Sequence, residues 1–201
     1  MTHCFSRRSF LKGSAAAAAA LTSPLLPADA AFSETENGLF SPVSALCQTQ
    51  YGPVKGREGE NGQLCWYGIP YGAAPTGESR WTAPQEPARW HAVRDCTSPA
   101  PAAYQYTTFP LGTEDCLTLD IYSSAEAKKR PVLVYLHGSA ATGSSLELPG
   151  SELVRDAGCV FVALNYRLGL FGWNCLPALT ADPDATGNFA LLDIARALDW
   201  V

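Results

Sequence analysis

The chain has 201 residues, of which 47% are hydrophobic, and a formal net charge of −5. This composition is typical of a folded globular protein and excludes a chain that is disordered throughout. The acidic balance argues against a nucleic-acid partner, because nucleic-acid-binding surfaces need clustered positive charge.

Residues 1–30 have the features of a twin-arginine export signal in the required order. Arg7 and Arg8 are followed by Phe-Leu-Lys, then by an apolar run with six alanines, and then by small residues at Ala28 and Ala30 that a signal peptidase can read. The alternative is a disordered, alanine-rich N-terminus. We expect the twin-arginine translocase and signal peptidase to be partners of this segment. Because the apolar run is too short for a membrane span, the mature chain is expected to be periplasmic or secreted, without a membrane anchor.

The mature chain is expected to hold a polar, flexible arm at 31–44 and one modest domain at 45–201. Removal of residues 1–30 takes away three basic residues and one acidic residue, which changes the net charge from −5 to −7. Six cysteines remain, and no two of them have the CxxC spacing of a metal site, so we expect neither a metal nor a cofactor. In an oxidising compartment some of these cysteines would pair. The sequence leaves open how four of them pair: Cys47, Cys65, Cys159 and Cys175.

The N-terminal half of the domain predicts a small hairpin followed by a long loop. Two short strands are expected at 49–56 and 63–72, and Asn61-Gly62 between them is a strong hairpin signal. Residues 73–110 are rich in proline, alanine and aromatic residues and have no period. We expect them to form an ordered surface loop, because their aromatic side chains give the loop apolar area to bury.

The second half predicts a strand–helix–strand unit. Alternation over 117–122 indicates a strand, and the unbroken apolar runs at 132–136 and 159–164 indicate strands buried on both faces. A short helix is expected at 151–157 between the last two, which makes a parallel βαβ unit. Another helix is expected from Asn188. No stop signal follows it, so we expect it to continue beyond residue 201.

A loop of small residues follows the strand at 132–136 and begins with His137-Gly138. In open α/β sheets, ligands bind at the carboxyl ends of the strands, and small side chains leave the backbone N–H groups there accessible. The alternative is a plain tight turn after a core strand.

Six motifs in order resemble the type B carboxylesterases, the family that includes the cholinesterases. They are Tyr67–Gly72, Gly77–Pro84, Glu114–Tyr122, the strand into His137-Gly138, Asn165–Gly172 and Gly187–Asp193. The resemblance implies the N-terminal portion of an α/β-hydrolase fold, with a small N-terminal hairpin and a mixed, mostly parallel sheet with helices. It also implies hydrolysis of small-molecule carboxylic esters by a serine, a histidine and an acid.

The catalytic residues of the family do not occur in these 201 residues. The family's nucleophile stands on a Gly-x-Ser-x-Gly elbow after the helix with which the sequence ends, and the acid and histidine come later. We therefore expect the chain to be inactive by itself, through truncation or an error in the gene model. The alternative is a non-catalytic binding or adhesion relative, or a remnant, of the same fold. A hidden triad of Ser144 or Ser145 with His91 or His137 is disfavoured, because no strand–turn–helix context supports it.

The resemblance nevertheless implies roles for several residues. The oxyanion turn falls at Gly138, Ser139 and Ala140, where the second and third glycines of the family are replaced. A disulfide is implied between Cys96 and Cys116. Two ion pairs are implied, Arg80 with Glu114 and Arg167 with Asp193. The loop that ends at Cys116 lacks the tryptophan that binds choline in cholinesterases, so a choline ester is not indicated; the acyl and alcohol groups are otherwise undefined.

Overall fold

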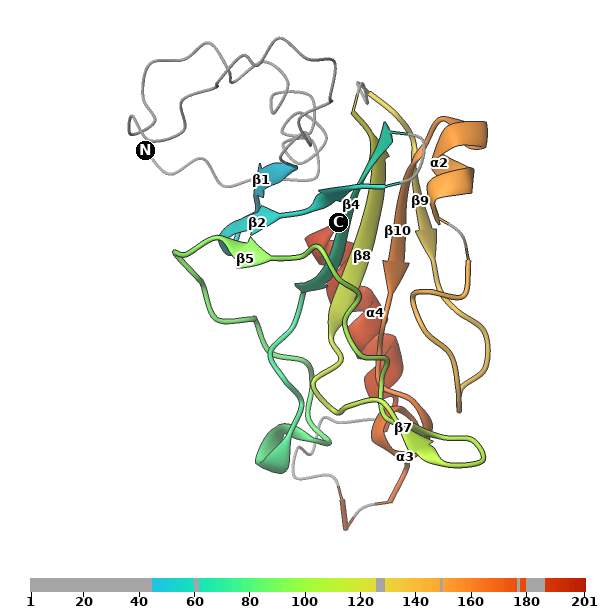
Figure 1. Cartoon of the computed structure of the whole chain (residues 1–201). Helices are drawn as coiled ribbons and strands as arrows, with labels where there is room; N and C mark the ends of the chain where they lie inside the picture. Colours follow the sequence, from blue (N-terminus) through green and yellow to red (C-terminus); the bar gives the residue numbers. More distant parts are fainter. Residues whose placement is uncertain (1–44, 60–61, 126–128, 149, 177, 180–186) are drawn as a thin grey trace, which may run out of the picture.

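The computed structural model describes residues 45–59, 62–125, 129–148, 150–176, 178–179 and 187–201 (Figure 1). The predicted export signal and the predicted arm at 31–44 therefore lie outside the described residues. Within the described part, no helix has the length and apolar character needed to cross a membrane.

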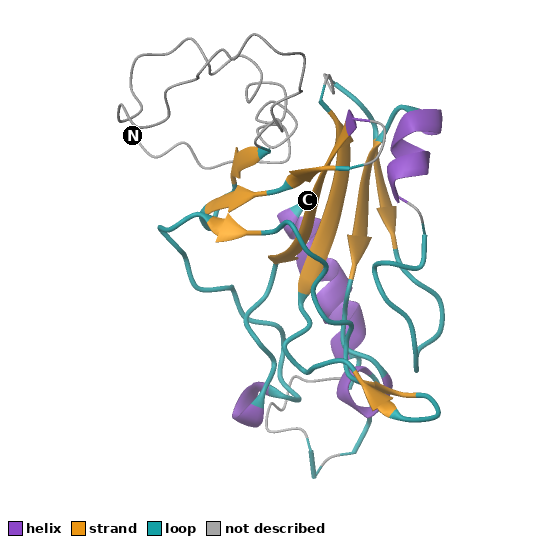
Figure 2. Cartoon of the chain, viewed as in Figure 1, coloured by secondary structure: helices purple, strands orange, loops and turns teal. Residues whose placement is uncertain are grey.

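A five-stranded mixed sheet forms the centre of the molecule, with strand order β3-β4-β8-β10-β9 (Figures 1 and 2). The pairs β3/β4, β4/β8 and β8/β10 are antiparallel, and β9/β10 is parallel. The parallel pair is the predicted βαβ unit, since helix α2 connects its two strands. The bounds are β3 Arg57–Glu58, β4 Gln63–Pro70, β8 Thr118–Ser124, β9 Val132–Tyr135, α2 Gly150–Ala157 and β10 Val160–Leu164.

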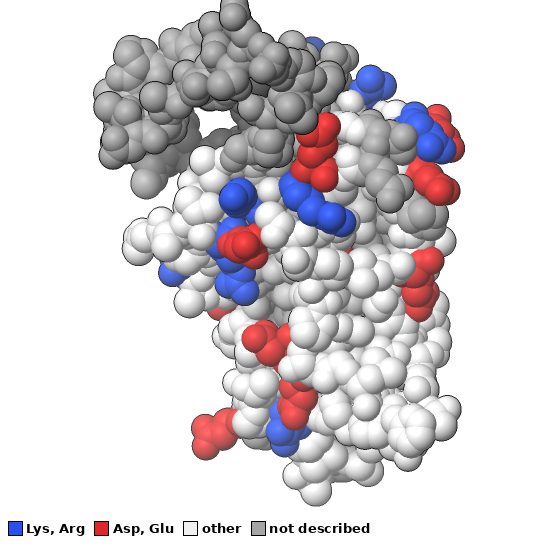
Figure 3. Space-filling model, in the orientation of Figure 1, with Lys and Arg blue, Asp and Glu red and all other residues white. Residues whose placement is uncertain are grey.

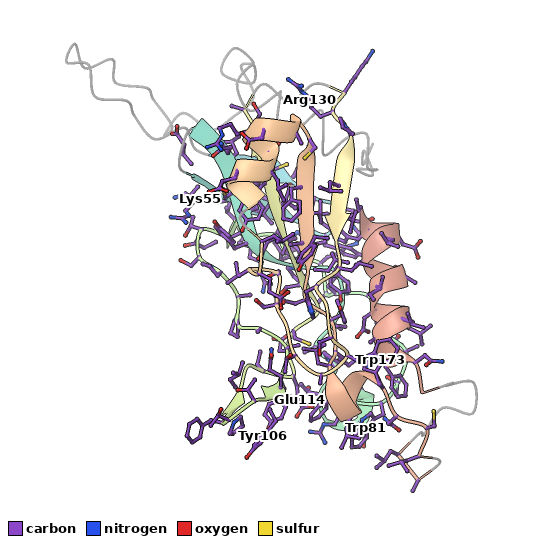
Figure 4. The ribbon with its side chains drawn as sticks, turned by 90° about the vertical axis from the view of Figure 1, so that its right-hand side faces the viewer. Lys55, Trp81, Tyr106, Glu114, Arg130 and Trp173 are labelled. Carbon is purple, nitrogen blue, oxygen red and sulfur yellow. The ribbon has the colours of Figure 1, made fainter. Side chains whose placement is uncertain are left out.

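Two helices cover opposite faces of this sheet (Figure 4). Helix α2 packs Val154 against Tyr122 and Phe161 on one face. Helix α4, Phe189–Trp200, packs Ala190 and Ala197 into the larger core on the other face. The alternation of side chains along each strand produces these two cores, because neighbouring residues in a strand point to opposite faces.

Strand β9 differs from the expectation of burial on both faces. Leu133 in β9 is 45% exposed, whereas every residue of β10 is buried. In the described part of the chain, β9 lies at the edge of the sheet and pairs only with β10. An apolar run therefore identified the strand correctly but not its place in the sheet, which depends on the neighbours that tertiary structure supplies.

The exposed edge of β9 predicts self-association. Leu133→Lys is expected to raise the monomer fraction, because an edge lysine opposes strand pairing with a second chain. Leu170→Lys is the control, since Leu170 is 66% exposed but lies in helix α3, Gly169–Gly172, and not at a sheet edge. Sedimentation velocity of both variants is the measurement. Equal monomer fractions in the two would contradict the prediction.

The predicted N-terminal hairpin is shorter than expected. Only Arg57–Glu58 pairs with β4, while β2, Pro53–Lys55, pairs with β1, Leu46–Gln48, and with β5, Arg94–Asp95, in a separate three-stranded sheet. The chain passes from β2 to β3 at Gly56, where it lies so close to β4 that a Cβ would overlap the Trp66 indole and the Cys65 carbonyl. This close crossing of two backbone segments directs β2 into the other sheet.

The loop at 73–110 is ordered and mostly irregular, as expected. It contains the short 3-10 helix η3, Gly77–Ser79, and strand β6, Gln105–Tyr106, which forms a small hairpin with β7, Pro110–Leu111. Aromatic rings anchor this loop: the Trp90 indole donates to the Pro53 carbonyl at 2.8 Å, and Tyr104 packs edge-on against Phe171.

Candidate functional site: an oxyanion turn

The small-residue loop begins where β9 ends, at the carboxyl edge of the parallel strand pair. Strands β9 and β10 run in the same direction, so the loop after β9 and helix α3 after β10 meet at this edge. The Gly169 N–H donates to the Ala140 carbonyl at 2.8 Å, which joins the two segments. The predicted turn thus lies where α/β sheets bind their ligands.

Ser139 adopts the backbone conformation that glycine usually occupies. Its φ is +69°, in the left-handed region, which is uncommon for a residue with a β-carbon. The Ser139 hydroxyl oxygen accepts the N–H groups of Ala141 at 3.2 Å and Thr142 at 3.3 Å. These two local hydrogen bonds offset part of the strain, because they stabilise the same turn that the positive φ makes.

The N–H groups of Ser139 and Ala140 remain available. Within the described residues, neither donates a hydrogen bond, whereas the next two N–H groups are taken by the Ser139 hydroxyl. Both residues are exposed, so a ligand oxygen can reach them. A pair of unused N–H groups at a strand end has the donor character of an oxyanion hole.

The first residue of the loop, His137, is buried and packs against Tyr166. Its ring stacks on Tyr166 with centroids 4.3 Å apart and an interplanar angle of 5°, and the Tyr166 hydroxyl donates to the His137 carbonyl at 2.6 Å. The residue is buried, and burial lowers the pKa of the imidazole, while Gly138 and Glu147 oppose that shift. Its Nε2 atom has no hydrogen-bond partner among the described residues. His137 is therefore a neutral packing group in the fold.

We expect His137 to make the protein less stable as the pH falls through about 6.5, the ordinary histidine pKa. Below that pH the unfolded chain binds a proton that the folded chain excludes, so the free energy of unfolding drops by at most about 1.4 kcal/mol per pH unit. His137→Gln should flatten this dependence in urea titrations between pH 7.5 and 5.5. His91→Gln, at an exposed histidine, is the matched control. Equal slopes in wild type and His137→Gln would contradict the prediction.

A buried polar network holds the far end of the loop. The Ser145 hydroxyl donates to Asp120 Oδ2 at 2.6 Å, and the Ser145 N–H donates to Asn165 Oδ1 at 2.9 Å. Asp120 also accepts the Gly68 N–H at 2.8 Å, and burial raises the pKa of its carboxyl. The sequence analysis did not assign Asp120 or Asn165 to this loop, because their partner lies 20 or more residues away along the chain.

Arg167 and Asp193 form a buried two-point ion pair. Arg167 Nε lies 2.8 Å from Asp193 Oδ2, and Arg167 Nη2 lies 2.6 Å from Asp193 Oδ1. Both side chains are at most 2% exposed. Burial raises the pKa of the Asp193 carboxyl, and the hydrogen bonds from Arg167 oppose that rise. This pair fastens α4 to the segment that follows β10.

Arg80 and Glu114 form a second two-point pair, nearer the surface. The two distances are 2.5 Å from Arg80 Nε to Glu114 Oε2 and 2.9 Å from Arg80 Nη2 to Glu114 Oε1. Arg167 Nη1 donates to the Arg80 carbonyl at 2.9 Å, so the two pairs are connected. Figure 4 shows Glu114 and Trp81 at the same end of the molecule, away from α2. Arg80 also lies over the Phe171 ring of α3, so the pairs connect the long loop to this helix.

The implied disulfide between Cys96 and Cys116 is absent, and both thiols are free and buried. The Cys96 carbonyl accepts the Tyr67 N–H in β4, while Cys116 precedes Thr118, which pairs with Pro70 at the end of the same strand. The two cysteines therefore lie beside different parts of β4. Burial raises the pKa of both thiols, to about 11 for Cys96. The expected disulfide is wrong because the segment that contains Cys96 runs beside the middle of β4, whereas Cys116 lies beside the end of that strand.

The structure does not assemble a catalytic triad from the described residues. Ser145 is buried and donates to Asp120, and no serine–histidine hydrogen bond is present in this part of the chain. What the site offers chemically is donor groups for a negative oxygen.

Comparison with known proteins agrees with this geometry. Residues 43–201 match the model of the carboxylesterase family, and residues 4–24 match the twin-arginine translocation pathway signal sequence. The chain therefore belongs to the carboxylesterase family and carries a signal for twin-arginine export to the periplasm or the exterior. Its fold is part of the α/β-hydrolase fold.

Individual members of the family are also similar to this chain. It is 39% identical to the para-nitrobenzyl esterase of Bacillus subtilis over 168 residues, which cover 78% of this chain and 34% of the relative. It is 36% identical to the fumonisin B1 esterase of Sphingopyxis macrogoltabida, covering 76% of this chain and 30% of the relative. A solved PNB esterase superposes with a TM-score of 0.70 at 39% identity, covering 78% of this chain and 33% of that one. The chain spans about a third of the length of these relatives.

Proposed function

We propose that this chain supplies the sheet and the oxyanion turn of an exported carboxylic ester hydrolase. The observation that carries the proposal is the pair of N–H groups at Ser139 and Ala140, which are exposed at the carboxyl edge of the sheet and unused within the described residues. N–H groups in such a place stabilise the oxyanion that forms when a nucleophile attacks an ester carbonyl. The esterase names of the relatives support the same reaction class.

The surroundings of the turn disfavour anionic esters, because the Glu147 carboxylate lies beside Gly143. No aspartate, glutamate, lysine or arginine occurs at 96–113 or at 131–146, the two segments that meet at the turn. Figure 3 shows an uncharged area at the lower right of the molecule. A neutral ester can approach such a surface without desolvating a charge.

Ester hydrolysis by this mechanism also needs a serine nucleophile, a histidine base and an acid. The 201 residues contain no Gly-x-Ser-x-Gly elbow. We therefore propose that these groups come from sequence outside these residues, and that the 201-residue polypeptide does not turn over esters. Hydrolysis of p-nitrophenyl acetate that a serine-reactive fluorophosphonate abolishes would contradict this.

The reading frame past the Val201 codon provides the positive test. An in-frame elbow, together with esterase activity of the longer product, is the expected result. In that product Ala140→Pro should lower kcat by about 10²–10³, because proline has no N–H to donate. Ala140→Gly keeps the N–H and should keep most of the activity. A longer product that is inactive would refute the proposal.

A further inference from the structure

Gln105 makes an unusual two-point contact with the loop that carries the oxyanion turn. The Gly143 N–H donates to Gln105 Oε1 at 2.9 Å, and Gln105 Nε2 donates back to the Gly143 carbonyl at 2.8 Å. The same nitrogen donates to the Ala103 carbonyl at 3.1 Å. Gln105 is 8% exposed, whereas Tyr106, the other residue of β6, is 69% exposed and points away from the molecule (Figure 4). The hairpin thus turns one side chain inward, and this side chain holds Gly143.

Gly143 closes the turn against its own beginning. Its φ is +141°, and a Cβ at this position would overlap Nδ1 of the His137 ring. His137 in turn is held by its stack on Tyr166 and by the hydrogen bond from the Tyr166 hydroxyl. The segment 137–143 is therefore a closed loop whose two ends touch, with Ser139 and Ala140 between them. We therefore expect a shift of Gly143 to be transmitted to the N–H groups of those two residues.

We propose that Gln105 is the positioning residue of the oxyanion turn: its amide clamps Gly143 against His137 and so sets the N–H groups of Ser139 and Ala140. An amide suits this task because it can accept a hydrogen bond and donate one at the same time, whereas a carboxylate can only accept. The inference rests on the proposed function for the purpose of the turn. The clamp itself can be tested without turnover.

The test is Gln105→Glu followed over pH in the 201-residue chain. At neutral pH the introduced carboxylate still accepts the Gly143 N–H but faces the carbonyls of Gly143 and Ala103 without a proton to donate. On acidification the carboxyl gains a proton and can restore the exchange of two hydrogen bonds with Gly143. A residue with a merely structural role would not produce a loss that protonation reverses.

The Gly143 amide can be observed almost alone. Threonine precedes glycine at three places in the sequence, 76–77, 142–143 and 186–187. Labelling with ¹³C-carbonyl threonine and ¹⁵N-glycine therefore selects three amide resonances, of which Gly77 and Gly187 are internal controls. Wild type corrects for titration of His137 and Glu147, the ionisable side chains beside Gly143. Gln85→Glu is the matched variant, because Gln85 is exposed and, among the described residues, its side-chain amide bonds only to the nearby Ala83 carbonyl.

We expect Gln105→Glu to shift the Gly143 resonance at pH 7. Repulsion between the carboxylate and the carbonyls of Gly143 and Ala103 should loosen its hold on the Gly143 N–H, which speeds hydrogen exchange of that amide by up to roughly tenfold, the size of one lost neutral hydrogen bond. Both effects should reverse as the introduced carboxyl is protonated, and Gln85→Glu should show neither. If Gln105→Glu fails to fold, all three resonances collapse. Gln105→Asn is then the variant to measure, because it keeps the amide but its side chain is too short to reach Gly143. It should change the Gly143 resonance alone. A Gly143 amide that neither variant alters would overturn the inference. Absence of esterase activity in the longer product would refute the proposed function and leave this result standing.

Discussion

Asp193→Asn is expected to lower the free energy of unfolding by about 3–5 kcal/mol, which is the largest effect that we predict for a single substitution. The substitution leaves the Arg167 guanidinium buried at 2% exposure without its counter-charge. The contacts of Arg167 Nη1 with the carbonyls of Arg80 and Thr82, at 2.9 Å each, cannot compensate for the lost carboxylate. Urea titration at pH 7 is the measurement.

Asp156→Asn is the matched control for that experiment. Asp156 also pairs with an arginine, Arg155, at 2.7 Å, but the two side chains are 68% and 49% exposed. An exposed pair is worth about 0–1 kcal/mol because water and salt screen it. The double replacement Arg167→Met with Asp193→Leu should recover part of the loss, since removing both charges ends the burial of an unpaired one. Similar losses for Asp193→Asn and Asp156→Asn would show that the buried pair is not a special anchor.

Gly143→Ala is expected to cost about 2–4 kcal/mol and to displace the oxyanion turn. Two causes add: the positive φ of +141°, which a residue with a β-carbon adopts with strain, and the overlap of that β-carbon with the His137 ring. Thermal melting gives the stability loss, and the Gly169 N–H bond to Ala140 should weaken with it in hydrogen-exchange measurements.

Gly77→Ala separates the two causes. Gly77 also has a positive φ, +57°, but nothing lies within 4 Å of the position that a Cβ would occupy. Its replacement should therefore cost only the backbone strain, about 1–2 kcal/mol. If the two alanine variants lose the same stability, contact with His137 does not constrain the turn, and the closed-loop description of residues 137–143 fails.

Local patterns predicted most of the secondary structure of the α/β part. The apolar runs that became β9 and β10, the alternating run that became β8 and the periodic helix α4 were all visible, because strand and helix periods are properties of neighbouring residues. The motifs also pointed to the family. The same patterns overestimated the hairpin at 49–72, since the close crossing at Gly56 depends on Trp66 and Cys65, which are contributed by another strand.

The cysteines show the opposite case. Cys96 and Cys116 could be matched to a family loop only by order along the chain, and order does not measure distance. In the fold Cys96 lies beside the middle of β4 and Cys116 beside its end, so both thiols stay free. Similarly, Gln105 gave no signal in the sequence: it stands in a charge-free loop without a period, and its role appears only because the hairpin turns it toward Gly143, 38 residues later.

The sequence by itself determined the export signal, the strand–helix–strand unit and the place of the turn at His137-Gly138, because each rests on residues that are consecutive or periodic. Tertiary structure alone decided that β9 lies at an edge of the described sheet, that the Ser139 hydroxyl takes the next two N–H groups, and that Gln105, Asp120 and Asn165 hold the loop. The physical reason is that backbone conformation follows local sterics and periodicity, whereas hydrogen bonds between distant segments form only after packing has brought them together.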